Sequence, residues 1–80
     1  MYKFLIRRAS IWGFYEDRSK LNIPEPFNSR LTKEFYEKDK RNGWFLELNS
    51  LEELLDLIIK VEASVIVGKS ELLIYDYYIE

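Results

Sequence analysis

The stretch Asn49–Val61, NSLEELLDLIIKV, decides how the rest of the chain must be arranged. Ser50 followed three residues later by Glu53 is the pattern of a capping box, in which both side chains accept hydrogen bonds from backbone N–H groups at a helix start. On a helical wheel the polar residues that follow span about 100° and the apolar residues about 200°. The sequence therefore predicts a helix over residues 51–61 with an apolar surface too wide for one flat sheet. We expect this surface to be wrapped by sheet and flanking aromatic residues, or to meet a partner.

Strands are predicted at both ends of the chain. Residues 2–8 alternate apolar and polar side chains, which is typical of a strand with one apolar face. Residues 63–67 and 70–75 flank the turn Gly68-Lys69, with strands expected over 63–67 and 71–77, and glycine at the first turn position is what a type II′ hairpin requires. Both faces of this hairpin are apolar, and the helix can cover only one of them. The face expected on the helix side carries Ala63, Val65, Val67, Ser70, Leu72 and Ile74, and the other carries Ser64, Ile66, Glu71, Leu73, Tyr75 and Tyr77.

The middle of the chain leaves a choice between helix and strand over residues 30–38. The dipeptide Asn42-Gly43 is a strong hairpin signal, and residues 44–48 alternate again. We therefore predict a hairpin of strands 31–37 and 44–48 with a two-residue turn at Asn42-Gly43. This register would set Lys38 opposite Glu47, a favourable cross-strand pair.

Residues 9–29 form a long irregular connection in which Pro24 and Pro26 favour extended backbone. Such loops are functional or loosely ordered. The second face of the sheet would then be covered by the aromatic stretch Trp12–Tyr15, by the proline segment or by another molecule. Together these patterns predict a single α+β domain over residues 1–80: a mainly antiparallel sheet of four to five strands packed on one amphipathic helix.

Composition argues against an enzyme. The 80 residues include no cysteine and no histidine, which removes thiolate chemistry, the commonest general base and the commonest metal ligand. The carboxylate pairs Glu52/Glu53, Glu16/Asp17 and Asp76/Glu80 fit solvated charge better than catalysis, and the three glycines are isolated. We expect no catalytic residue, no metal site and no cofactor. No signal peptide or membrane span is evident, so a cytoplasmic location is expected.

Charge is divided unevenly along the chain. The net charge is −2, yet residues 1–43 hold ten Lys/Arg against six Asp/Glu, whereas residues 44–80 hold two against eight. One interpretation is that the two halves neutralise each other in the fold. The alternative is a basic face for a polyanion and an acidic face for a basic protein surface.

Two stretches resemble small uncharacterised proteins of phages and mobile elements in low-GC bacteria. They are the opening KFLIRRAS from Lys3, and WFLELNSLEELL from Trp44 followed by an apolar strand and the ending IYDYYIE. The resemblance covers about the first ten and the last thirty-seven residues. Phage proteins of this size often inhibit or redirect host proteins, so the resemblance implies an anti-CRISPR or other anti-defence inhibitor acting in the host cytoplasm.

The function that these observations favour is a small non-enzymatic protein-binding module. Tyrosine suits such interfaces because it has a stiff apolar body and a polar tip. The expected contact residues are Ile66, Glu71, Leu73, Tyr75, Asp76, Tyr77, Tyr78 and Glu80. The competing interpretation is that these residues pack under the 9–29 connection of the same chain.

Two alternatives remain. The first is nucleic-acid binding through a basic hairpin, with Trp12 or Tyr36 stacking on bases. Its candidate residues are Arg7, Arg8, Arg30, Lys33, Lys38, Lys40 and Arg41. The second is a self-associating structural protein that joins the basic half of one copy to the acidic half of the next.

Overall fold

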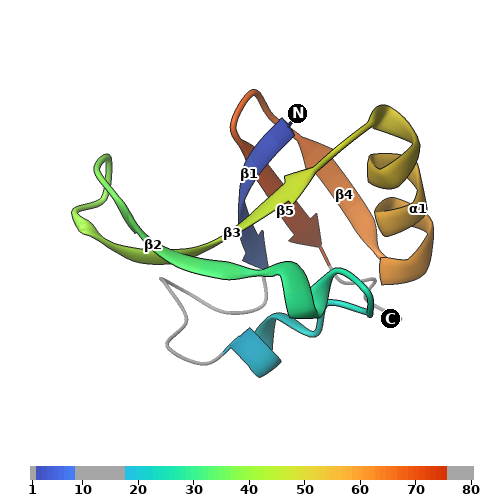
Figure 1. Ribbon diagram of the computed structural model, residues 1–80, viewed down its shortest axis with the longest axis horizontal. Helices are drawn as coiled ribbons and strands as arrows, with labels where there is room; N and C mark the ends of the chain where they lie inside the picture. Colours follow the sequence, from blue (N-terminus) through green and yellow to red (C-terminus); the bar gives the residue numbers. More distant parts are fainter. Residues whose placement is uncertain (1, 9–17, 76–80) are drawn as a thin grey trace.

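The computed structural model describes residues 2–8 and 18–75, and in this part of the chain one helix packs on one face of a five-stranded sheet (Figure 1). The elements are β1 Tyr2–Arg8, β2 Thr32–Tyr36, β3 Arg41–Leu48, α1 Leu51–Val61, β4 Ser64–Val67 and β5 Glu71–Tyr75. The strand order across the sheet is β2-β3-β1-β5-β4. Every neighbouring pair is antiparallel except β1 and β5, which are parallel. The predicted α+β class is confirmed, and residues 32–36 are strand rather than helix.

β1 lies at the centre of the sheet, between β3 and β5. Phe4 and Ile6 are buried on the helix side, where they belong to the same core cluster as Leu46 and Leu72. Leu5 points to the opposite side and is also fully buried. Residues 4–6 are therefore buried on both faces of β1, which fits a central position because neighbouring strands then shield it on both edges.

The helix begins and ends where the sequence predicts. The Ser50 side chain accepts a hydrogen bond from the Glu53 backbone N–H at 3.3 Å, and the Glu53 carboxylate accepts one from the Asn49 N–H at 2.6 Å. The first bond satisfies an N–H group that a helix start leaves without a partner, and the second ties the residue before the N-cap to the first turn. Glu62 follows the last turn with φ 53°, the left-handed conformation that ends many helices. Leu54, Leu57 and Val61 are buried against the sheet.

A second cover for the same face comes from residues 18–31. This segment contains two short 3₁₀ turns, Arg18–Leu21 and Asn28–Arg30. Leu21, Ile23, Phe27 and Leu31 are buried in the cluster that also holds the helix residues. The expectation of loose order is therefore wrong for residues 18–31, which supply core, and a functional role of this connection stays a prediction. The proline segment covers the helix face of the sheet, not the opposite one. Residues 9–17, with Trp12–Tyr15, lie outside the described residues.

The predicted turn at Asn42-Gly43 is wrong. Tyr36 pairs with Arg41 and Glu34 with Gly43, so residues 37–40 form the turn and Asn42-Gly43 lies inside β3. The predicted register would have set residues 44–47 opposite residues 38–41, all of which are charged. The observed register sets β3 against a strand with aromatic side chains, and the rings of Tyr36 and Phe45 lie 6.0 Å apart between centroids. Lys38 lies in the turn and does not face Glu47.

The β4–β5 hairpin also differs from its predicted register. The Gly68 N–H donates to the Glu71 carbonyl at 2.8 Å, which leaves Lys69 and Ser70 as the turn residues. Gly68 thus precedes the turn rather than occupying its first position. A Cβ at position 68 would lie 3.2 Å from the Glu71 carbonyl oxygen, so glycine suits this close pair. The observed register pairs apolar residues, Val67 with Leu72 and Val65 with Ile74, where the predicted one would have set Val67 against Ser70.

Candidate protein-interaction site

The sheet face that turns away from α1 is polar over β1, β2 and β3. Lys3 Nζ lies 2.6 Å from Glu34 Oε1, and the Thr32 hydroxyl donates to the same carboxylate at 2.7 Å. These contacts hold the pKa of Glu34 below its ordinary value, with the Lys3 hydrogen bond as the largest cause. Lys3 also lies 5.4 Å from the centroid of the Phe45 ring.

A second cluster on this face is built around Arg7. Its guanidinium pairs with Asp39 and lies 3.8 Å from Glu71, and it sits 5.8 Å from the centroid of the Tyr36 ring. The Tyr36 hydroxyl donates to Glu71 Oε1 at 2.7 Å, and this bond to a carboxylate raises the pKa of the Tyr36 hydroxyl. Arg7, Asp39 and Glu71 are thus engaged within one cluster. Glu71, one of the expected contact residues, is among them.

The other half of this face, over β5 and β4, is apolar. Ile66 on β4 lies opposite Leu73 on β5, and Ser64 lies opposite Tyr75. Ile66 is 55% exposed and Tyr75 38%, whereas Leu73 is half-buried. The structure therefore brings together three of the expected contact residues, Ile66, Leu73 and Tyr75, which we call the tyrosine patch. The other expected residues, Asp76, Tyr77, Tyr78 and Glu80, lie outside the described ranges.

A second apolar surface lies on the helix. Leu51, Leu55 and Ile59 recur every four residues and are 58%, 60% and 73% exposed. We call these residues the helix stripe. It belongs to the wide apolar arc that the sequence predicts, and neither the sheet nor the 18–31 segment wraps it.

The position of the helix stripe follows from its neighbours. On the opposite flank of α1, Glu53 pairs with Arg30 at 2.7 Å, and Lys60 lies 5.8 Å from the centroid of the Phe27 ring. Arg30 also donates to the Glu47 carbonyl of β3, so this flank is the one toward β3. The helix stripe is therefore on the flank toward β4. This strand is at one end of the strand order, and Figure 1 shows it near the helix.

The basic residues do not form one surface. Arg7 is engaged as described, Arg30 pairs with Glu53, and Arg8 is buried and donates to the Leu21 carbonyl at 2.7 Å. Lys33 lies 6.0 Å from the centroid of the Trp44 ring, on the helix side of the sheet. The remaining candidates, Lys38, Lys40 and Arg41, are exposed at the end of the β2–β3 hairpin. Of the two proposed stacking residues, Tyr36 is held in the Arg7 cluster and Trp12 lies outside the described residues. Nucleic-acid binding stays a prediction.

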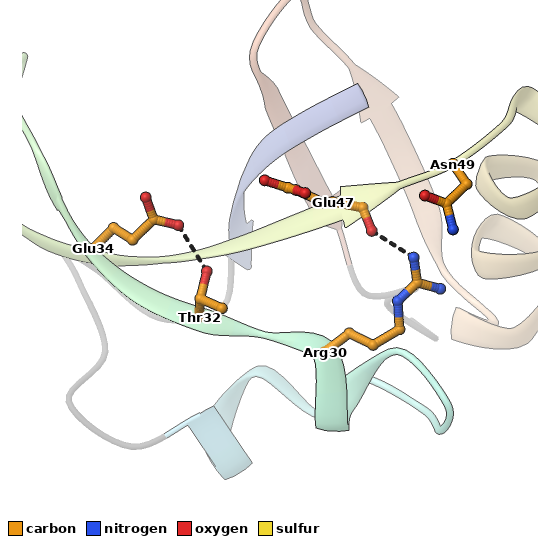
Figure 2. Close-up of a pocket in the computed structure, with 5 residues that line it drawn as sticks. All are labelled: Arg30, Thr32, Glu34, Glu47 and Asn49. Atoms are coloured by element: carbon orange, nitrogen blue, oxygen red, sulfur yellow. Dashed lines mark hydrogen bonds between the residues drawn. The ribbon is translucent and has the colours of Figure 1, made fainter. Parts of the chain in front are cut away.

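One open groove of about 360 Å³ lies beside β2 and the end of β3 (Figure 2). Its lining residues are Arg30, Thr32, Glu34, Glu47 and Asn49. Figure 2 shows the Arg30 guanidinium turned to the Glu47 carbonyl, which it reaches at 2.6 Å, and Thr32 bonded to Glu34. The Arg30 and Glu34 charges are therefore already paired within the chain, with Glu53 and Lys3.

Two other features, a metal site and a membrane-spanning helix, were sought in the described part of the chain. Residues 2–8 and 18–75 contain no group of three acidic residues placed to hold a metal ion. Within the same ranges, no helix has the length and apolarity that crossing a bilayer requires. Comparison with known proteins gave no match, whether with family models, curated proteins or solved structures.

The Arg30–Glu53 pair predicts how stability depends on pH. The pKa of Glu53 is lowered, first by the hydrogen bond from Arg30 and then by that from the Asn49 N–H. A lowered pKa in the folded state adds stability above the ordinary value of 4.5, and this stability is lost as the pH falls through the lowered value. We expect Glu53→Gln to unfold at lower urea than wild type at pH 7, and the gap to shrink toward pH 3. The matched control is Glu52→Gln, its exposed neighbour; an equal effect of both variants would contradict the prediction.

Proposed function

We propose that this chain is a small non-enzymatic protein-binding module whose contact surface is the tyrosine patch. The observation that carries the proposal is the exposure of Ile66 and Tyr75 beside Leu73, on the half of the sheet face that lacks the ionic clusters. Monomeric proteins rarely leave contiguous apolar side chains uncovered without a use. Tyrosine adds a hydroxyl that can bond to a partner while its ring is buried.

The chemistry of the patch indicates the kind of partner. Its side chains are apolar apart from the Tyr75 hydroxyl and the small Ser64 hydroxyl at one end. The nearest carboxylate, Glu71, is already bonded to Tyr36. A partner surface that is largely apolar, with a hydrogen-bonding group for the tyrosine, fits better than a strongly basic one. The resemblance to phage and mobile-element proteins suggests the setting, in which the partner is a host protein and the module inhibits it in an anti-CRISPR or other anti-defence role.

Site-specific photo-crosslinking tests this proposal. A benzophenone amino acid at position 75 should capture one specific protein in cells, and the same group at position 35 should not. Phe35 is the matched control because it is 57% exposed but lies on β2, at the other edge of the sheet.

The captured protein is then purified and its affinity measured. Tyr75→Ala should weaken binding at least about tenfold, as truncation of a central interface residue does, and Phe35→Ala should leave it unchanged. The urea midpoint of Tyr75→Ala should stay close to that of wild type. Crosslinks of equal yield at both positions, or full affinity of Tyr75→Ala, would remove the tyrosine patch as the contact surface. A large fall in the urea midpoint would instead favour cover by the chain's own residues.

A further inference from the structure

We propose that a second copy of this chain pairs with β4, so that two sheets join edge to edge across a two-fold axis. The pairing uses the β4 edge and the helix stripe, and of the tyrosine patch it takes only Ile66.

The two edges of the sheet differ in their protection against such pairing. β2 at one edge carries Lys33 and Glu34, and charged side chains are a common device that keeps an edge strand from pairing with another chain. β4 at the other edge reads SVIV and has neither charge nor proline. Its short length limits the number of hydrogen bonds it can offer, so a stable contact needs side-chain burial beside it. The helix stripe on the same flank supplies that surface.

The hydrogen-bond pattern of β4 sets which backbone groups are available. The Gly68 N–H bonds to Glu71 of β5, and in an antiparallel pair successive residues turn their backbone groups to opposite sides. Residues 64, 66 and 68 therefore face β5, whereas Val65 and Val67 turn their N–H and C=O groups outward. An antiparallel copy would bond to these two residues.

A two-fold axis perpendicular to the sheet keeps the helix face of one copy on the same side as that of the other. With Ile66 on the axis, Ile66 meets Ile66 of the second copy on the face away from the helix. Val65 then lies opposite Val67 of the second copy on the helix face, and these are the residues whose backbone groups point outward. In this register every side-chain pair formed by residues 65–67 is apolar.

The same axis brings the two helix stripes toward each other, because both lie on the β4 flank of the same face. Leu51, Leu55 and Ile59 would then be shielded by their counterparts, which accounts for three of the most exposed apolar side chains. At the ends of the paired strands, Lys69 of one copy comes next to the Ala63–Glu62 end of the other. Opposite charges would therefore meet at the rim. An interface that is self-complementary in this way is what a two-fold dimer needs.

A single cysteine tests the register directly, because the chain has none of its own. Residues facing each other in a non-hydrogen-bonded antiparallel pair have Cα atoms about 4.5 Å apart, within the span of a disulfide. Ile66→Cys should therefore form a disulfide-linked dimer under mild oxidation, and Phe35→Cys, equally exposed on β2, should stay monomeric. Equal cross-linking of the two variants, or none in Ile66→Cys, would overturn the proposed register.

Sedimentation velocity on the cysteine-free chain tests the dimer itself. The wild-type protein should show a concentration-dependent dimer. The double variant Leu55→Glu and Ile59→Glu should raise the dimer dissociation constant at least about tenfold, since the carboxylates would be buried without partners. Val67→Pro should do the same by removing an outward N–H that β5 does not use. Phe35→Glu is the control and should leave the constant unchanged. A wild-type protein that stays monomeric up to millimolar concentration overturns the proposal, as does a dimer that these variants leave intact while circular dichroism shows them folded.

Discussion

Phe27→Ala should lower the free energy of unfolding by about 3–5 kcal/mol, the range for removing a large buried aromatic side chain. Phe27 is 1% exposed, and its ring is packed in the core cluster beneath α1. It comes from the irregular segment between β1 and β2, so the size of the loss reports how far that segment belongs to the core. The measurement is a urea titration followed by tryptophan fluorescence and by circular dichroism.

The control for this variant is Phe35→Ala. Phe35 has the same side chain but is 57% exposed on the edge strand β2, so we expect a loss within about 0.5 kcal/mol. Because Phe27→Ala removes much of the stability of so small a domain, Phe27→Leu serves as a milder variant with a smaller loss. Equal losses for the two alanine variants would mean that the 18–31 segment does not pack on the core.

Leu57→Ala should cost about 2–5 kcal/mol, because it leaves a cavity between the helix and the sheet. Leu57 is 1% exposed and belongs to the core cluster, whereas Leu55, two residues away, is 60% exposed on the helix stripe. Leu55→Ala is therefore the matched control, with an expected loss of well under 1 kcal/mol in the monomer. The pair is compared in urea at a protein concentration low enough to exclude self-association. A loss of a few tenths of a kcal/mol for Leu57→Ala would show that this side of the helix does not face the core.

The helix and the central strand could be predicted from the sequence because their signals are local. The capping pattern at Ser50 and Glu53 and the alternation of residues 2–8 each lie within a single element. Hairpin registers are harder, since they depend on which residues meet across two strands. At Asn42-Gly43 the favourable turn dipeptide does not form the turn, because β3 pairs with residues 32–36 and not with the charged residues 38–41.

Both register errors nonetheless left the side chains on the correct faces. In each hairpin the observed pairing differs from the predicted one by an even number of residues, and side chains alternate with a period of two along a strand. For this reason Ile66, Leu73 and Tyr75 were predicted to share a face, and the structure places them together. The internal pairing of Glu71 with Tyr36 could not be predicted, because it joins strands whose order in the sheet the sequence does not reveal.

The core role of residues 18–31 was missed for a similar reason. Leu21, Ile23 and Phe27 show neither helical nor strand periodicity, and two prolines interrupt the segment. Their burial depends on contact with strands and a helix that come later in the chain. The width of the apolar arc on α1 predicted that one sheet could not cover all of it. Whether other residues would cover Leu51, Leu55 and Ile59 depends on tertiary contacts that the sequence does not reveal.

The central position of β1 also bears on how the protein folds during synthesis. The partner strands of β1 are β3 and β5, and Leu5 pairs with Glu71, near the opposite end of the described chain. While the ribosome is still translating the residues before β5, one backbone edge of β1 has no partner and its apolar side chains are incompletely covered. Folding of the sheet must therefore wait for β5 to emerge, and sheets built on such distant pairings form slowly. During that interval the nascent chain is the form most exposed to aggregation and to capture by chaperones.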